Sequence, residues 1–341
     1  MRTIAVLGAG SWGTALAVHL GRVGHDVRLW ARDSRLVAEL NERRANAVYL
    51  PDVTLPGTVS ITTSLERALA DTELVVSAIP SHGCRAVMRA AAPHLTPGAV
   101  VVSATKGLEG DSLLRMSDVI AQELGPAHPV VVLSGPSFAA EVAKQLPTAV
   151  LAASTDARAT ALVQAEFRGP YFRLYGSDDV VGVEIGAALK NVIAIAAGVV
   201  EGLGLGHNAL AALITRGLAE VTRLACAAGG RRETLAGLSG LGDLVLTCTG
   251  SLSRNRHVGI ELARGRSLHD IVAGMKMVAE GVRTTGAALA LGARYGAELP
   301  IATQMNEVLA GRSDVRSAVD ALMVRRQRSE AEESPNDQVT R

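Results

Sequence analysis

Aromatic residues are scarce in this chain of 341 residues, at 3% of the total. A core must therefore be built mostly from Ala, Val, Leu and Ile, and a hydrophobic content of 48% supplies enough of them. Neither sign of charge prevails, because the formal net charge is +1. This balance gives no electrostatic reason to expect nucleic acid or an anionic membrane surface as a partner.

Cysteine is also scarce, with three widely spaced copies: Cys84, Cys226 and Cys248. An odd number with no C-x-x-C pair argues against a disulfide framework and a metal site, and fits a reducing compartment. The N-terminus lacks the charged region, apolar region and cleavage site of a signal peptide, so we expect none. The longest apolar stretch, Ile185–Val200, is interrupted by Lys190 and Asn191 and is shorter than the ~20 residues of a membrane span. We predict a buried helix there and no membrane insertion.

The pattern of expected secondary structure changes near residue 177. Before it, short runs rich in Val and Ile alternate with helical runs such as 14–22, 112–123 and 157–166. Six strands are expected, several apolar throughout as in sheets covered on both faces: Thr3–Leu7, Val27–Trp30, Leu74–Ile79, Val100–Ser103, Val130–Leu133 and Ala149–Ala153. Alternating βα units predict a mostly parallel, doubly wound α/β sheet over residues 1–177.

After residue 177 no strand pattern is evident, and we predict an all-α second domain over residues 178–325. Its expected helices are 178–200, 209–227, 254–263, 268–273, 284–295 and 301–310. Residues 326–341 are almost entirely polar, so we expect a disordered tail.

A glycine motif follows the first expected strand and opens a helix: Gly8, Gly10 and Gly13 in G-A-G-S-W-G. In that context G-x-G-x-x-G predicts a Rossmann dinucleotide site, with backbone N–H groups facing a pyrophosphate. The alternative is an ordinary glycine-rich turn. The second strand ends without a carboxylate and meets Arg32, a cation suited to the 2′-phosphate of NADPH. Asp33 follows and leaves NADH open, and Arg32 can also be read as a solvated loop charge.

Lys190 lies on a helix that is small and apolar on all sides. A buried lysine has a lowered pKa and suits proton transfer, whereas the competing interpretation is a lysine whose ammonium reaches solvent. Asp243, in a glycine-rich turn, can orient Lys190 or accept a hydrogen bond from a substrate hydroxyl; alternatively, it only shapes the turn or caps a helix. Further on, Ser253, Arg254 and Asn255 offer donors for a phosphate at a helix start, unless Ser253 only caps that helix.

Two polar loops follow neighbouring expected strands. Lys106 lies in S-A-T-K-G, and Gly135 and Ser137 lie in S-G-P-S-F-A. Both loops are expected at the carboxyl edge of the sheet, where open α/β folds bind ligands, although each can be an ordinary strand exit. The spacing of His82, His207 and His257 suggests no metal, and nothing marks Cys84 or Cys248 as a nucleophile.

Taken in order, these motifs resemble the bacterial NAD(P)-dependent glycerol-3-phosphate dehydrogenase family. The resemblance runs from residue 1 to about 325, through G-A-G-S-W-G-T-A, A-T-K-G, S-G-P-S, L-K-N-V-I-A, L-G-D-L and L-S-R-N-R. It implies NAD(P)H-dependent, reversible reduction of dihydroxyacetone phosphate to sn-glycerol 3-phosphate for glycerophospholipid synthesis. It also implies a cytoplasmic enzyme that is commonly a homodimer.

The resemblance assigns roles residue by residue. Lys190 becomes the proton donor and acceptor, assisted by Asp243. Substrate contacts are expected from Lys106, Gly135, Ser137, Lys190, Asp243, Ser253, Arg254 and Asn255. Cofactor contacts are expected from Gly8, Gly10, Ser11, Trp12, Gly13, Arg32, Lys106, Ala139, Arg254, Val278 and Glu280. Two positions depart from the family, which usually has Gly at Ala187 and often Lys at Leu210.

Two other functions compete with this interpretation. A related hydroxy-acid reductase would need a carboxylate clamp and no phosphate on its substrate. An NADPH-sensing protein would need the glycine motif but not Lys190, Asp243 and Arg254 together.

Overall fold

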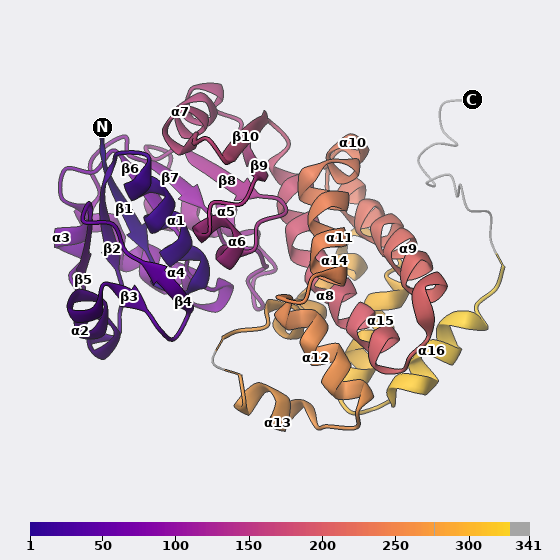
Figure 1. The fold of residues 1–341 in the computed structure, drawn as a ribbon. Helices are drawn as coiled ribbons and strands as arrows, with labels where there is room; N and C mark the ends of the chain where they lie inside the picture. The colour runs from indigo at the N-terminus through magenta and orange to yellow at the C-terminus, as the bar shows by residue number, and fades with distance from the viewer. Residues whose placement is uncertain (276, 328–341) are drawn as a thin grey trace, which may run out of the picture.

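The chain folds into two parts that lie side by side in the computed structural model, which describes residues 1–275 and 277–327. The N-terminal half forms an α/β part and the C-terminal half a bundle of helices (Figure 1). The last strand of the sheet ends at Ser177 and the first long helix begins at Val180. Most of the predicted tail, from residue 328 onward, lies outside the described residues.

The α/β part is built on an eight-stranded sheet in the order β10-β9-β8-β7-β6-β1-β2-β5. Every neighbouring pair is parallel except β8 and β9, which are antiparallel. Its strands are β1 (Thr3–Leu7), β2 (Asp26–Trp30), β5 (Val59–Thr62), β6 (Leu74–Ser77), β7 (Val100–Ser103), β8 (Val130–Ser134), β9 (Thr148–Ala153) and β10 (Phe172–Ser177). All six predicted strands are present, and the mostly parallel sheet is confirmed.

Helices cover both faces of the sheet, which is the doubly wound arrangement that the sequence predicts. In β1, Ile4 and Val6 belong to one buried apolar cluster, whereas Ala5 and Leu7 belong to the cluster on the other face. Such two-sided burial explains why the central strands are apolar throughout. The covering helices are α1 (Ser11–Arg22), α2 (Ser34–Arg43), α3 (Leu65–Leu69), α4 (Ser81–Ala91), α5 (Met116–Leu124), α6 (Ala139–Ala143) and α7 (Ala157–Phe167).

The regular secondary structure of the second part is all helix, with no strand among residues 178–275 and 277–327. Its helices are α8 (Val180–Gly202), α9 (Gly206–Ala227), α10 (Arg232–Ala236), α11 (Asp243–Thr249), α12 (Arg254–Ala263), α13 (Leu268–Ala273), α14 (Glu280–Tyr295), α15 (Pro300–Leu309) and α16 (Val315–Met323). The predicted bounds of α12 and α13 are as observed. A serine caps each helix, Ser253 and Ser267.

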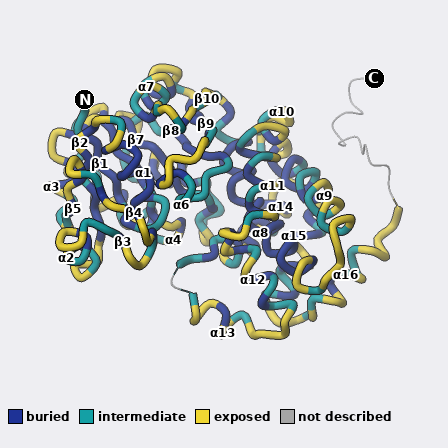
Figure 2. The backbone as a smooth tube through the Cα atoms, in the orientation of Figure 1, coloured by how far each residue is buried: buried dark blue, intermediate teal, exposed yellow. Residues whose placement is uncertain are grey.

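Helix α8 is the central element of this part. By length and apolarity alone it passes for a membrane span, but 89% of the apolar window is buried inside the protein. Figure 2 shows it as a largely buried segment enclosed by the other helices. The predicted buried helix over Ile185–Val200 is therefore confirmed.

Helices α8 and α12 cross with their backbones in direct contact. A Cβ atom added at Gly198 would lie 1.9 Å from the carbonyl oxygen of Arg256, and one added at Gly259 would lie 1.9 Å from that of Ile195. Only glycine fits at either position. The crossing brings the middle of α8, which carries Lys190, against the start of α12.

Candidate active site

The glycine motif forms the turn between β1 and α1. Gly8 has a φ of +110°, and a Cβ at Gly13 would lie 1.8 Å from the carbonyl oxygen of Gly8. Gly10, in contrast, faces open space and has no side chain with which to cap α1. An uncapped helix start beside open space fits a pyrophosphate group. At the same turn, the indole N–H of Trp12 is buried without a hydrogen-bond partner among the described residues.

A short antiparallel hairpin braces this turn, and sequence reasoning missed it. It consists of β3 (Ala45–Asn46) and β4 (Leu50–Thr54). The buried Asn46 amide donates to the carbonyl oxygen of Ala9 at 2.9 Å and to Thr14 Oγ1 at 2.8 Å. The hydroxyl of Ser11 donates to the carbonyl oxygen of Tyr49 at 2.6 Å. No local pattern around Asn46 signals this role, because both partners lie more than 30 residues away in the sequence.

Arg32 and Asp33 have different surroundings at the end of β2. The Asp33 carboxylate accepts from the backbone N–H groups of Arg35 and Leu36, and so caps α2. Arg32 is exposed. One oxygen of the Asp33 carboxylate, the group that would favour NADH, is therefore engaged by its own helix, while the Arg32 side chain is accessible to a ligand.

Lys190 and Asp243 form the centre of the site. Lys190 Nζ lies 2.6 Å from Asp243 Oδ1, and Lys106 Nζ lies 2.8 Å from Asp243 Oδ2. One buried carboxylate thus bridges two ammonium groups, one from the loop after β7 and one from α8. Lys190 and Asp243 are 6% and 1% exposed. The predicted burial of Lys190 is confirmed, and the alternative of an ammonium in solvent is wrong.

The surroundings of Lys190 tune its acidity. Burial lowers the pKa of its ammonium to about 8, because desolvation penalises the charged form. The Asp243 carboxylate opposes this shift, and the positive charge of Lys106 adds to it. The pKa of the amine thereby comes close to neutral pH, and a side chain with such a pKa serves well as a proton donor and acceptor.

Thr247 also binds the Lys190 amine and was missed from the sequence. Lys190 Nζ donates to Thr247 Oγ1 at 2.8 Å, and that hydroxyl donates to the backbone carbonyl of Asp243 at 2.6 Å. Thr247 lies one turn after Asp243 on α11, the helix that follows the π-helical turn at residues 238–242. A Thr four residues after an acidic residue is too common in helices to be a signal.

The two polar loops after β7 and β8 meet at the carboxyl edge of the sheet, as predicted. Lys106 Nζ donates to the carbonyl oxygen of Gly135 at 2.8 Å and lies 3.3 Å from Ser137 Oγ. Ala139 begins α6, which packs against α1. The loops that were candidate substrate contacts thus share one lysine with the Asp243 carboxylate.

Two buried amides continue the site toward α14. Asn255 Nδ2 donates to Asn191 Oδ1 at 2.9 Å, and the N–H of Gly281 donates to Asn255 Oδ1 at 3.0 Å. Asn191 in turn donates to the backbone carbonyl of Lys106 at 3.4 Å. This series of hydrogen bonds fixes α12 and the first turn of α14 relative to Lys106. Asn191 had no assigned role in the sequence.

The remaining predicted residues lie around this centre. Ser253 caps α12 through the N–H of Arg256, so the capping interpretation of that serine is confirmed. The negative charge of Glu280 favours the charged form of the exposed Arg254 guanidinium, which makes no hydrogen bond within the described part of the chain. Glu280 accepts from the N–H and hydroxyl of Ser81, at the start of α4. Val278 is half-buried in the segment before α14.

Several other residues stay out of the chemistry. The predicted surface histidines His82, His207 and His257 are exposed. Burial raises the pKa of the Cys84 and Cys248 thiols to about 12, which leaves neither as a nucleophile at neutral pH. Among residues 1–275 and 277–327, no group of three His, Cys, Asp or Glu side chains could hold a metal ion.

The two departures from the family pattern are accommodated by packing. Ala187 is buried, and its carbonyl accepts from the Asn191 amide at 3.3 Å. Leu210 is half-buried against the apolar core of the helical part. Neither side chain displaces a residue of the Lys190 centre.

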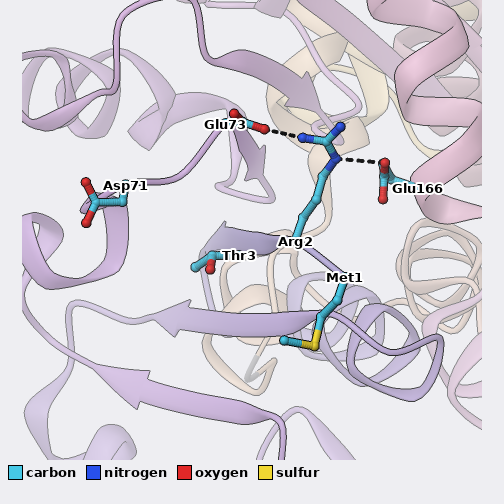
Figure 3. A pocket seen from close by; sticks show the side chains of 6 residues that line it. All are labelled: Met1, Arg2, Thr3, Asp71, Glu73 and Glu166. Atoms are coloured by element: carbon cyan, nitrogen blue, oxygen red, sulfur yellow. Dashed lines mark hydrogen bonds and ion pairs between the residues drawn. The ribbon is translucent and has the colours of Figure 1, made fainter.

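A separate hollow lies at the amino ends of the strands, on the side of the sheet away from Lys190, where β1 begins (Figure 3). It is lined by Met1, Arg2, Thr3, Asp71, Glu73 and Glu166. Arg2 Nε lies 2.8 Å from Glu166 Oε1, and the same guanidinium is paired with Glu73. With its single guanidinium already paired twice and an excess of carboxylates, this hollow does not suit a phosphorylated ligand.

Comparison with known proteins agrees with this geometry. Family models for the N-terminus and C-terminus of NAD-dependent glycerol-3-phosphate dehydrogenase match residues 3–160 and 179–320. The chain is 55% identical to a glycerol-3-phosphate dehydrogenase (NAD(P)+) of Koribacter versatilis, over 95% of this chain and 98% of that protein. A relative of the same name from Acidobacterium capsulatum is 54% identical over 97% and 100%.

A solved structure agrees as well. The crystal structure of glycerol-3-phosphate dehydrogenase from Coxiella burnetii superposes with a TM-score of 0.92, at 40% identity over 95% of this chain and 99% of that one. Since the two family models span both parts of the fold, the chain belongs to the NAD-dependent glycerol-3-phosphate dehydrogenase family.

Proposed function

We propose that this chain reduces dihydroxyacetone phosphate to sn-glycerol 3-phosphate with a nicotinamide cofactor, and that Lys190 supplies the proton. The observation that carries the proposal is the buried carboxylate of Asp243 between Lys190 and Lys106, 2.6 Å and 2.8 Å away. This group joins the α/β part, which has the glycine turn, to the helical part, which has the phosphate-binding candidates. The family membership supports the same reaction.

In this proposal the residues of the chain orient the ketone and move one proton. The bound cofactor supplies the hydride that the C2 carbon of the ketone receives. Lys190 Nζ gives its proton to the C2 oxygen, and Asp243 keeps the amine in place. Lys106, with Gly135 and Ser137 beside it, binds the polar end of the triose. Arg254, Asn255 and the N-terminal turn of α12 bind the phosphate.

The cofactor site fits a dinucleotide at the glycine turn, with its adenosine end toward β2. We propose a preference for NADPH over NADH. An NADH site needs a free carboxylate near the end of β2 for the ribose hydroxyls. Asp33 is engaged by the start of α2, whereas the exposed Arg32 has the charge and planar shape that a 2′-phosphate requires.

Replacing Arg32 by alanine should therefore reduce discrimination between the two cofactors. A charge-assisted hydrogen bond to phosphate accounts for about 10- to 100-fold in affinity. We expect kcat/KM for NADPH to fall by that factor and kcat/KM for NADH to change little. Arg43→Ala, at the far end of α2, is the matched control. An equal loss with both cofactors in Arg32→Ala would refute the role in 2′-phosphate recognition.

The pH dependence should report the ionisation of Lys190. Reduction requires the protonated amine, whose pKa is lowered to about 8 by burial. We expect kcat/KM for dihydroxyacetone phosphate to fall as pH rises through about 8. Oxidation of glycerol 3-phosphate requires the neutral amine, so its kcat/KM should rise through the same range. Initial rates in both directions from pH 6 to about pH 10 check these opposite slopes.

Substrate comparison separates this function from its rivals. We expect rapid NADPH oxidation with dihydroxyacetone phosphate and very slow oxidation with unphosphorylated dihydroxyacetone, because the phosphate contacts would be lost. Preference for an unphosphorylated hydroxy acid would indicate the related reductase. Absence of turnover with every triose phosphate would indicate an NADPH-sensing protein.

We also propose that the enzyme is a cytoplasmic homodimer that supplies glycerol 3-phosphate for glycerophospholipids. The support for this is the resemblance of the whole chain to its family. Sedimentation equilibrium of the purified protein measures the mass of the assembly directly.

A further inference from the structure

A second buried carboxylate, Glu184, joins the two parts of the molecule away from Lys190. It lies on α8 and is 3% exposed. Its Oε1 accepts from the backbone N–H of Ser117 at 2.9 Å, and its Oε2 accepts from the Ser117 hydroxyl. The guanidinium of Arg115 lies 3.2 Å from the same Oε2. Sequence reasoning gave no role to any of these residues.

The partners of Glu184 all stand at the N-terminus of α5, a helix that covers the sheet. The carboxylate therefore caps a helix of the α/β part from a helix of the other part. Burial raises the pKa of Glu184 because desolvation disfavours its charge, and Arg115 and Ser117 oppose that shift. Burying a carboxylate is costly and a buried ion pair adds little net stability. The contact is better explained by the arrangement that it fixes.

Apolar packing beside Glu184 holds the same end of α8 against the sheet. Val183 is buried in one cluster with Val132 of β8 and Ala153 of β9. The β8 strand leads directly to the loop with Gly135 and Ser137, both near Lys106. The first turns of α8 are thus fixed to the strand whose end lies in the proposed active site.

Lys190 follows Glu184 by six residues on this one continuous helix, about 9 Å along its axis. A tilt or shift of α8 at Glu184 would therefore move the Lys190 amine relative to anything bound on the sheet. In hydride and proton transfer, misplacement by about 1 Å can reduce the rate about 100-fold.

We propose that Glu184 is a positioning residue for the reaction: it locks α8 to the start of α5, so that the Lys190 amine meets a carbonyl held over the sheet edge. This inference rests on the proposed role of Lys190. It predicts that loss of the carboxylate slows the chemical step and leaves the binding of cofactor largely intact, since the partners of Glu184 among the described residues are Ser117 and Arg115, away from the glycine turn.

The test compares Glu184→Gln and Glu184→Ala with a matched control, Glu220→Gln. Glu220 is also a buried carboxylate that caps a helix, accepting from the N–H groups of Ile301 and Ala302 at 2.8 and 2.9 Å. Both of these hydrogen bonds lie within the helical part, however. The measurements are the thermal unfolding midpoint, KM for NADPH, and the single-turnover rate of hydride transfer to dihydroxyacetone phosphate well below the midpoint.

We expect hydride transfer to slow about 10-fold in Glu184→Gln, which keeps an acceptor for the Ser117 N–H, and about 100-fold in Glu184→Ala. KM for NADPH should stay within about 2-fold. Glu220→Gln should change the unfolding midpoint without changing the rate. Wild-type hydride transfer in both Glu184 variants overturns the proposal. An equal loss in Glu220→Gln also overturns it, because the loss would then follow from general destabilisation.

A Lys190→Met variant separates this proposal from the one on which it depends. If Lys190→Met retains turnover, the role of Lys190 fails whatever the Glu184 variants do. If Lys190→Met is inactive and both Glu184 variants react like wild type, only the role of Glu184 fails.

Discussion

Replacing Lys190 by alanine is expected to lower kcat for reduction of dihydroxyacetone phosphate by about 10²- to 10⁴-fold, the usual contribution of a general acid. The buried amine donates to both Asp243 and Thr247, and alanine removes this ammonium, so the proton it would give to the C2 oxygen is lost. Affinity for NADPH should hardly change, because the glycine turn is formed by other elements. Steady-state kinetics and fluorescence titration with NADPH measure the two quantities separately.

Lys144→Ala is the control for this experiment. Lys144 is an exposed lysine at the end of α6, a helix that packs against α1 of the α/β part. We expect wild-type kinetics from it. Turnover in Lys190→Ala within a few-fold of that control would remove Lys190 from the reaction.

Replacing Gly198 by alanine is expected to destabilise the protein by about 3 kcal/mol or more, the upper end of the range for overpacked cores. The new methyl group would lie 1.9 Å from the carbonyl oxygen of Arg256 and 2.9 Å from Gly259 Cα. Both obstacles are backbone, so α8 and α12 have to separate. Chemical denaturation with circular dichroism detection measures the change in the free energy of unfolding.

Activity of Gly198→Ala should fall along with stability, because the same helix pair holds the Asn191–Asn255 hydrogen bond. Gly286→Ala on α14 is the matched control. A Cβ there meets nothing within 4 Å, so alanine should stabilise the helix by about 0.5–1 kcal/mol. A Gly198→Ala protein as stable as wild type would show that the observed helix crossing is wrong.

The central strands of the sheet could be predicted from the sequence, but its two edge strands, β5 and β10, could not. Buried parallel strands such as β6 and β7 are short apolar runs, which stand out in a sequence. Strand β5 contains Ser60 and Thr62, and β10 contains Arg173 and Gly176, so both resemble loops. Each lies at an edge of the sheet, where one side has no neighbouring strand and apolarity is not required.

Three helices, α7, α12 and α13, begin at the residue predicted, and a side chain caps each of them. Helix α12 begins after Ser253 as expected. Helix α5 begins at Met116, four residues later than predicted, and its capping carboxylate comes from Glu184 on a distant helix. When the capping residue comes from a distant part of the chain, the sequence next to the helix start gives no sign of it.

The site was predictable where chemistry is unusual and unpredictable where it depends on contacts between distant segments. A lysine in an apolar helix is costly to bury, so Lys190 was conspicuous. The expectation that parallel strand ends meet at one edge placed Lys106 near Ser137. Asn46 and Thr247 have no unusual sequence surroundings. Only the folded chain brings Asn46 to the glycine turn and Thr247 to the Lys190 amine.

The most direct test of the central claim, that Lys190 donates the proton, is the pH dependence of kcat/KM for reduction in wild type and in Lys106→Met. The positive charge of Lys106 helps to lower the pKa of Lys190, and its removal also leaves Asp243 to Lys190 alone. Both effects stabilise the charged amine. We predict that the decline near pH 8 moves to higher pH in the variant. A decline at the same pH in both proteins would contradict the assignment.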